Sequence, residues 1–253
     1  MIAKTPEQIK ALREAGKRMK TVVDEVLALV RPGVPSMELE AKAREITERV
    51  GAVPSYLNYP SGKKGKLYPA AICVSVNNEI AHSPPKPNKI LQAGDVVSID
   101  FGLLYNGYFM DTAYTLAVGE VDAKAKNLIE GTREALPAAI AAARVGGTVG
   151  DIGATVEAVA KKYKLGIVKD LMGHGVGNDV HEGPNVPNFG NAGMGEKLVE
   201  GMVVALEPIF AEGSGVMIDD SDDFGYITRD GSRAAHFEHT ILITKGDAEI
   251  LTA

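Results

Sequence analysis

The feature that most constrains the fold of this chain is an internal repeat. Residues 94–100 read Gly-Asp-Val-Val-Ser-Ile-Asp and residues 201–207 read Gly-Met-Val-Val-Ala-Leu-Glu, so both segments place a glycine before an apolar strand that ends in an acid. Similarity between two parts of one chain predicts two units of similar fold. We therefore expect an α/β fold in one domain, 1–253, whose halves at about 1–120 and 121–253 are related by a pseudo-twofold axis.

Helices are predicted at matching places in the two halves. Residues 30–36 and 144–150 each end one helix at a glycine and begin another near a Ser or Thr. In the first half, Thr5 is the expected N-cap of a helix, with Gln8 completing a capping box. Ser36 is the expected N-cap of a second helix that runs to about residue 50.

The second half repeats this arrangement after a set of strands. Strands are predicted at 71–76, 96–101 and 107–118. An alanine-rich stretch at 122–143 predicts a third helix, which Pro137 should kink or break. A fourth helix should begin at a Thr148 cap, with Asp151 at its third position, and run to about residue 163. Strands and glycine-rich loops are expected after residue 166.

The composition excludes several classes of function. A net charge of -6 argues against non-specific binding to nucleic acid, which needs a basic surface. The first residues lack the order of a signal peptide, and no segment approaches the ~20 apolar residues of a membrane helix, so we expect a cytoplasmic protein without membrane contact. The single cysteine, Cys73, excludes internal disulfides and thiolate-rich zinc sites. Any metal ligands are therefore oxygens and imidazoles.

Acids at the ends of the repeated strands point to a metal site. Asp100 and Glu207 each close an apolar run, and a buried charge is costly unless a partner or a metal compensates it. Either acid alone is explained by a salt bridge, but the repetition favours a metal. Asp111 follows Asp100 across a hairpin turn at 105–107, so the two acids are expected to face each other on adjacent antiparallel strands.

Two histidines lie in a glycine-dense segment at 173–184. Glycines allow a backbone to approach a ligand closely, and imidazole suits borderline divalent metals, so His174 and His181 are candidate site residues. Glu238 lies in another apolar strand and is a candidate beside Glu207. The alternative interpretation pairs Glu207 with a nearby lysine and Glu238 with an arginine of the segment 229–233.

Taken in order, these candidates resemble a known signature. The similarity to methionine aminopeptidases of the short, bacterial-like type I form covers essentially the whole chain. It includes the flanking segments 75–82, 97–100, 173–177, 181–184, 201–203, 207–208 and 237–240. The signature residues are His82, Asp100, Asp111, His174, His181, Glu207 and Glu238. The resemblance implies a pita-bread fold, in which helices cover a central antiparallel sheet.

The resemblance also implies roles for these residues. Two divalent ions, Co, Mn, Fe or Zn, are expected at an oxygen-rich site with one imidazole. Their ligands are Asp100, Asp111, His174, Glu207 and Glu238, with Asp111 and Glu238 bridging. Glu207 is also the expected proton shuttle, His181 contacts the scissile carbonyl, and His82 contacts the departing amide. The implied methionine pocket consists of Tyr59, Tyr68, Cys73, His82 and Phe224.

The implied reaction removes the initiator methionine from newly made polypeptides and favours a small second residue. The family default is a monomer. One departure from the family is the lengthened link 60–67 beside the pocket. Its lysines, Lys63, Lys64 and Lys66, predict either a solvated tip or a contact with ribosomal RNA or an acidic substrate.

Two alternatives remain open at this point. A peptidase of the Xaa-Pro or prolidase type shares the fold but generally carries a sizeable extra N-terminal domain. A non-catalytic binding protein on the same fold would have lost ligands, whereas all five are present here. Type II methionine aminopeptidases carry a helical insertion for which the segment between His181 and Glu207 leaves no room.

Overall fold

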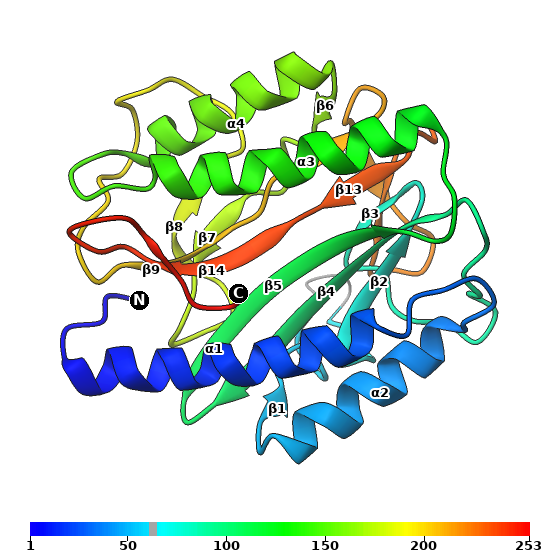
Figure 1. Ribbon diagram of the computed structural model, residues 1–253, viewed down its shortest axis with the longest axis horizontal. Helices are drawn as coiled ribbons and strands as arrows, with labels where there is room; N and C mark the ends of the chain where they lie inside the picture. Colours follow the sequence, from blue (N-terminus) through cyan, green and yellow to red (C-terminus); the bar gives the residue numbers. More distant parts are fainter. Residues whose placement is uncertain (61–64) are drawn as a thin grey trace.

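The structure, a computed structural model, describes residues 1–60 and 65–253. Its centre is an antiparallel sheet in the order β1-β4-β5-β14-β9-β7-β8, with β2 also on β4 and β15 on β14 (Figure 1). The strands of this sheet are β1 (Val53–Pro54), β2 (Ile72–Val76), β4 (Val96–Tyr105), β5 (Tyr108–Ala117), β7 (Gly173–Gly175), β8 (Glu182–Val186), β9 (Val203–Leu206), β14 (Glu238–Leu242) and β15 (Glu249–Ile250). Since β5 pairs with β14, the two predicted halves meet in one continuous sheet.

Two smaller sheets complete the β structure within the described residues. In one, β10 (Ile209–Ala211) pairs with β13 (Ala234–His236) and β6 (Gly166–Ile167). In the other, β12 (Tyr226–Thr228) pairs with β11 (Met217–Asp219) and β3 (Glu79–Ala81). The chain passes directly from β13 to β14, so the first small sheet joins the large one where Glu238 lies.

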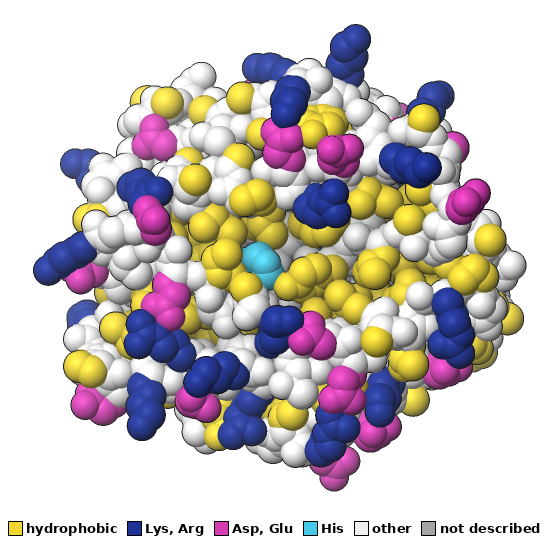
Figure 2. All heavy atoms as spheres, viewed as in Figure 1, with side chains coloured by type: hydrophobic (Ala, Val, Ile, Leu, Met, Phe, Trp, Pro, Cys, Tyr) yellow, Lys and Arg dark blue, Asp and Glu magenta, His cyan; other side chains and the backbone are white. Residues whose placement is uncertain are grey.

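Four helices lie over one face of the large sheet (Figure 1). They are α1 (Pro6–Leu27), α2 (Ser36–Arg49), α3 (Ala123–Ala142) and α4 (Val149–Tyr163). Apolar side chains of α1 and α2 pack with those of β4 and form one core, and those of α3 and α4 pack with those of β9 and form a second. Figure 2 shows this helix-bearing face, with charged side chains on the outer parts and hydrophobic ones gathered between the helix pairs.

The internal repeat is visible in the backbone. Gly33 and Gly146, in the two links between paired helices, have φ angles of +88° and +85°, a conformation that glycine adopts without strain. Their N–H groups donate to the carbonyls of Leu91 and Leu198, which precede the two repeated strands. The equivalent contacts confirm that the repeat in sequence is a repeat in structure.

The predicted helix starts are confirmed in three cases and corrected in one. Thr5 and Thr148 both form capping boxes, and Asp122 caps α3. At α2 the N-cap is Pro35, not Ser36. The Ser36 hydroxyl instead bonds to the backbone of Lys86, accepting from its N–H at 3.0 Å and donating to its carbonyl at 3.1 Å. The serine thus fixes a loop rather than a helix end.

Pro137 does not break α3, which is continuous from Ala123 to Ala142. The proline lies on the exposed side of the helix, as does Arg133, whose carbonyl loses its helical partner. Solvent can satisfy that carbonyl, so the proline is tolerated. Among the helices described, none is both long and apolar enough to cross a membrane.

Candidate active site

The β4–β5 hairpin positions the two aspartates. In its register, Asp100 pairs with Ala113 and Asp111 with Gly102, so the acids are diagonal neighbours on one face and do not stand directly opposite each other as predicted. Asp100 also lies within β4, which pairs with β5 as far as Tyr105; the expectation that it ends its strand was wrong. Glu207, by contrast, directly follows β9, as predicted.

The junction of β5 and β14 brings the second half to these acids. Ala113 pairs with Asp100 on one side and with Glu238 on the other, and its small side chain leaves space between the two carboxylates. The Thr112 hydroxyl donates to the Glu238 carbonyl at 2.6 Å. Thr240 accepts from the Asp111 N–H at 3.0 Å and donates to its carbonyl at 2.8 Å. Hydroxyls thus hold the two halves in register at the site.

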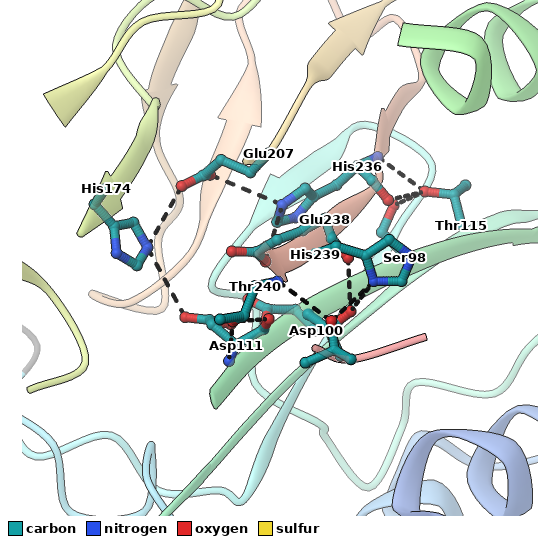
Figure 3. A network of polar contacts seen from close by, with 12 residues as sticks. Ser98, Asp100, Asp111, Thr115, His174, Glu207, His236, Glu238, His239 and Thr240 are labelled. Atoms are coloured by element: carbon teal, nitrogen blue, oxygen red, sulfur yellow. Dashed lines mark hydrogen bonds and ion pairs between the residues drawn. The ribbon is translucent and has the colours of Figure 1, made fainter. Parts of the chain in front are cut away.

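His174 faces the carboxylates with its Nε2 atom (Figure 3). This atom lies 3.6 Å from Glu207 Oε1 and 3.9 Å from Asp111 Oδ2. The Nδ1 atom lies 2.9 Å from the Gly175 carbonyl, which only accepts, so we assign the ring hydrogen to Nδ1 and a lone pair to Nε2. One ligand atom each from Asp111, His174 and Glu238 lies within 4.8 Å of the others, the only such grouping among the residues described.

Burial makes the negative charge of these four carboxylates energetically costly. Burial and the mutual repulsion of the acids raise the pKa values of Asp100, Glu207 and Glu238 well above their usual range. Burial also raises the pKa of Asp111, to about 6. Bound protons or bound cations must therefore offset the negative charge of these buried carboxylates. The residues present therefore fit divalent metal ions, with hard oxygen ligands and one imidazole.

The alternative of separate salt bridges for the two glutamates is not seen. Arg233 pairs with Asp122 and with Glu212, both at 2.8 Å. Within the described residues, the only basic side chains within 4 Å of the Glu207 and Glu238 carboxylates are the imidazoles of His174 and His236, which burial keeps neutral near pH 7. The glutamates thus belong to the buried cluster and not to a surface ladder.

A pocket with a cavity volume of about 200 Å³ opens above the acids and histidines. The residues predicted for the site all line it: Tyr59, Tyr68, Cys73, His82, Asp100, Asp111, His174, His181, Glu207, Phe224 and Glu238. The His181 ring lies 4.4 Å from that of His174, centroid to centroid, and its Nδ1 atom lies 3.1 Å from the Tyr59 hydroxyl. Burial lowers the pKa of His181 to about 4, so the ring is neutral near pH 7.

An apolar cluster forms one wall of the pocket. It includes Tyr68, Cys73 and Val180, with Tyr59 and Phe224 packed against it. The Phe224 ring stands edge-on to Tyr68, with centroids 5.7 Å apart. The predicted methionine pocket is therefore one contiguous surface.

The rim of this wall includes part of the lengthened link. Lys66 pairs with Asp223 at 2.5 Å, and its ammonium lies 5.9 Å from the Phe224 ring centre. Lys66 is thus bonded to the segment 223–224 of the same wall and is not a free tip. Lys63 and Lys64 lie outside the described residues, so a contact of this link with ribosomal RNA stays a prediction.

Two residues of the site were missed from the sequence. The Tyr56 hydroxyl donates to both Asp100 Oδ1 and Asp111 Oδ1. His236 is buried, and its Nε2 atom lies 3.5 Å from Glu238 Oε2 and 3.8 Å from Glu207 Oε2. His236 lies two residues before Glu238 in sequence, and this spacing could have identified it as a candidate site residue. No local pattern links Tyr56 to acids more than forty residues away.

Comparisons with known proteins match this chain to one family of metallopeptidases over nearly its whole length. The model of metallopeptidase family M24 matches residues 10–245. A methionine aminopeptidase of Aquifex aeolicus is 43% identical over 97% of this chain and 96% of its own length. Methionine aminopeptidase 1 of Bacillus subtilis is 36% identical over 100% of this chain and 99% of its own.

Solved structures separate the two peptidase alternatives. The crystal structure of methionine aminopeptidase from Thermotoga maritima matches with a TM-score of 0.94 and 39% identity over 100% of this chain and 99% of that one. Prolidase from Pyrococcus furiosus matches with a TM-score of 0.75 and 26% identity, and only 65% of its chain is covered. The pita-bread fold and a metallo-aminopeptidase activity are confirmed, and neither alternative is favoured. The chain belongs to metallopeptidase family M24 and, within it, to the methionine aminopeptidases.

Proposed function

We propose that this protein hydrolyses the first peptide bond of newly made polypeptides and releases their initiator methionine, with a small residue in second place. The observation that carries the proposal is the lone pair of His174 Nε2 facing buried carboxylates at the base of an apolar pocket. We further propose that residues 1–253 act as one catalytic domain, as a cytoplasmic monomer.

Two divalent ions, Co, Mn, Fe or Zn, would be held by this cluster. The ligands that would hold these ions are Asp100, Asp111, His174, Glu207 and Glu238, and the family resemblance implies that Asp111 and Glu238 would be shared between the two ions. Four carboxylates carry a charge of about -4, which balances two divalent cations. When bound, such ions lower the pKa of a water molecule to near neutrality and stabilise the negative charge that develops on the scissile carbonyl oxygen.

The protein's own groups position the substrate and move the proton. Glu207 takes the proton of the attacking water and delivers it to the departing amine, and its backbone is held by Asn188, whose Nδ2 donates to the Glu207 carbonyl at 2.9 Å. With Nδ1 accepting from the Tyr59 hydroxyl, His181 carries its hydrogen on Nε2, where it donates to the scissile carbonyl oxygen. His82 binds the departing amide.

The apolar wall accounts for the selection of methionine. Tyr59, Tyr68, Cys73 and Phe224 present aromatic and sulfur surfaces to the pocket. A flexible, polarizable thioether packs well against such surfaces. His82 closes the pocket beside the scissile bond, with its ring 5.5 Å from that of Tyr226.

The test is a metal-dependent peptidase assay. Metal-free protein would be reconstituted with Mn, Co or Fe and offered Met-Ala-Ser and Xaa-Pro peptides. We expect methionine release from the first peptide only. Absence of release by protein that has taken up metal would refute the proposal, and release of Xaa from Xaa-Pro would establish prolidase-type activity instead.

A further inference from the structure

Tyr56 is a buried residue of the site, and it takes no part in the proposed reaction. Its side chain lies in the pocket wall and is only 8% exposed. Its hydroxyl oxygen is 2.7 Å from Asp100 Oδ1 and also within hydrogen-bond distance of Asp111 Oδ1. A phenol carries one proton, so this single donor is shared between the two aspartates.

The fold holds the Tyr56 ring in this position from several sides. Gly102 lies beneath it on β4, and a Cβ atom there would lie 2.2 Å from Ser55 Oγ and 2.5 Å from Tyr56 Cε1, so it would displace both residues. The adjacent Ser55 N–H donates to the Gly102 carbonyl at 3.0 Å. The Tyr68 ring stands edge-on at 6.4 Å. The absence of a side chain at Gly102 is thus what lets the hydroxyl reach the acids.

The Tyr56 hydroxyl fixes the orientation of the two aspartate carboxylates. Tyr56 engages the Oδ1 atoms of both aspartates, while Asp111 Oδ2 faces His174 Nε2 across 3.9 Å. Hydrogen bonds to ligating carboxylates orient them and tune the metal that they bind. The hydroxyl therefore orients Asp100 and Asp111 already in the metal-free protein.

We propose that Tyr56 is a positioning residue of the metal centre, whose hydroxyl holds Asp100 and Asp111 in the orientation that binds divalent ions. The proposal rests on the metal site of the proposed function. Partners of this kind typically contribute 10- to 100-fold to metal affinity or activity. The effect should be largest for the ion that Asp100 helps to hold.

The experiment compares two tyrosine-to-phenylalanine variants. Metal-free wild type, Tyr56→Phe and Tyr68→Phe would be titrated with Co²⁺ and Mn²⁺ by calorimetry, and the visible absorption of the Co²⁺ forms recorded. Tyr68 is the matched control, because its ring lies in the same wall but its hydroxyl donates to the Ile72 carbonyl at 3.3 Å. We expect Tyr56→Phe to weaken binding about 10- to 100-fold and to alter the Co²⁺ spectrum, whereas Tyr68→Phe keeps the wild-type metal affinity.

The outcomes separate this inference from the proposed function. If wild type binds no divalent metal, the proposed function itself fails. If wild type binds metal and Tyr56→Phe binds it equally well with an unchanged spectrum, only the positioning role is overturned. Thermal unfolding of the metal-free proteins checks that the variants are folded.

A second variant tests the same contact with the hydroxyl retained. Gly102→Ala should displace the Tyr56 ring and weaken metal binding in the same direction. In the double variant Gly102→Ala/Tyr56→Phe, the two losses should not add, because both remove one interaction. Fully additive losses would show that Gly102 affects metal binding independently of the Tyr56 hydroxyl, and would overturn the role assigned to Gly102 in placing the ring.

Discussion

The two halves of the molecule build the same site in different ways. The first half supplies Asp100 and Asp111 from within one hairpin, β4–β5. The second half supplies His174, Glu207 and Glu238 from three segments that are distant in sequence, with both glutamates at or just beyond strand ends. A short carboxylate suffices from within a strand, whereas the longer glutamate reaches in from its end. A repeated backbone has thus diverged in chemistry.

The groups that support the ligands differ in the same way. In the first half a tyrosine hydroxyl donates to both aspartates. In the second half an imidazole, His236, lies near both glutamates, and its ring nitrogens have no hydrogen-bond partner in the described structure. The two aspartates therefore share a hydrogen-bond donor in the metal-free structure, and we expect the two glutamates near His236 to gain more order than the aspartates when metal binds.

The largest expected effect is at Asp111, which touches both halves. Asp111→Asn keeps the shape of the side chain but removes its charge, so metal-dependent activity should fall below detection and metal affinity should drop by more than about 100-fold. Calorimetry and metal content measure this loss. An ion bound with unchanged affinity would show that the second half forms a site without the first.

A large effect on turnover alone is expected at His181. His181→Ala removes a donor to the carbonyl oxygen but no metal ligand, so kcat should fall about 10²- to 10³-fold with metal content unchanged. Steady-state kinetics and metal analysis give the two readouts. Loss of bound metal would mean that His181 belongs to the ligand set.

The pH dependence of the metal-free protein should show opposite signs for the buried carboxyl groups and for the buried histidines of the site. Burial raises the pKa of Asp111 to about 6, so the folded state binds more protons than the unfolded state between about pH 4 and 6. The stability from this proton is complete below about pH 4 and is lost as the pH rises through 6. Burial lowers the pKa of His181 to about 4 and that of His236 to about 3, so these histidines destabilise the fold as the pH falls below about 6.5.

Thermal unfolding across pH 4 to 7 tests this opposition. Metal-free Asp111→Asn should gain stability relative to wild type as the pH rises, by about 2 kcal/mol in the free energy of unfolding. Saturating divalent metal should reverse the order, because wild type binds the metal much more tightly than Asp111→Asn does. A difference between the proteins that is independent of pH would contradict the assigned pKa of Asp111.

The smallest effect is expected at His236. In the loaded centre its Nε2–H should donate to one of the two nearby glutamates, so His236→Leu should weaken metal binding about tenfold. His236→Gln retains a donor and should recover part of the loss. Equal losses in His236→Leu and Tyr56→Phe would show that the halves are energetically alike despite their chemistry.

Local signals predicted most of the elements and made all five proposed ligands candidate site residues, and the family resemblance then assigned them as ligands. The capping boxes at Thr5 and Thr148 lie within four residues, and the acids stand in or beside their own apolar strands. The predictions that failed concern residues whose structure is determined by contacts or exposure that are not visible in the local sequence. Ser36 bonds a residue fifty positions away, and Pro137 is tolerated because its side of α3 is exposed.

Tyr56 could not be predicted for the same reason. Its role depends on the register of β4 against β5, which places Gly102 and Asp111 side by side. It also depends on the path of the loop before β2, which brings the ring over Gly102. Neither the strand register nor the path of this loop can be deduced from a short sequence motif.

The hydroxyl bonds between β5 and β14 have a consequence for how this protein is made. Asp111 and Thr240 lie 129 residues apart, yet their mutual bonds close the sheet at the acids. While the chain is being synthesised, the hairpin with both aspartates emerges long before its partner strand. We therefore expect firm capture of divalent ions only after β14 has left the ribosome, so that acquisition of metal would mark the completion of folding.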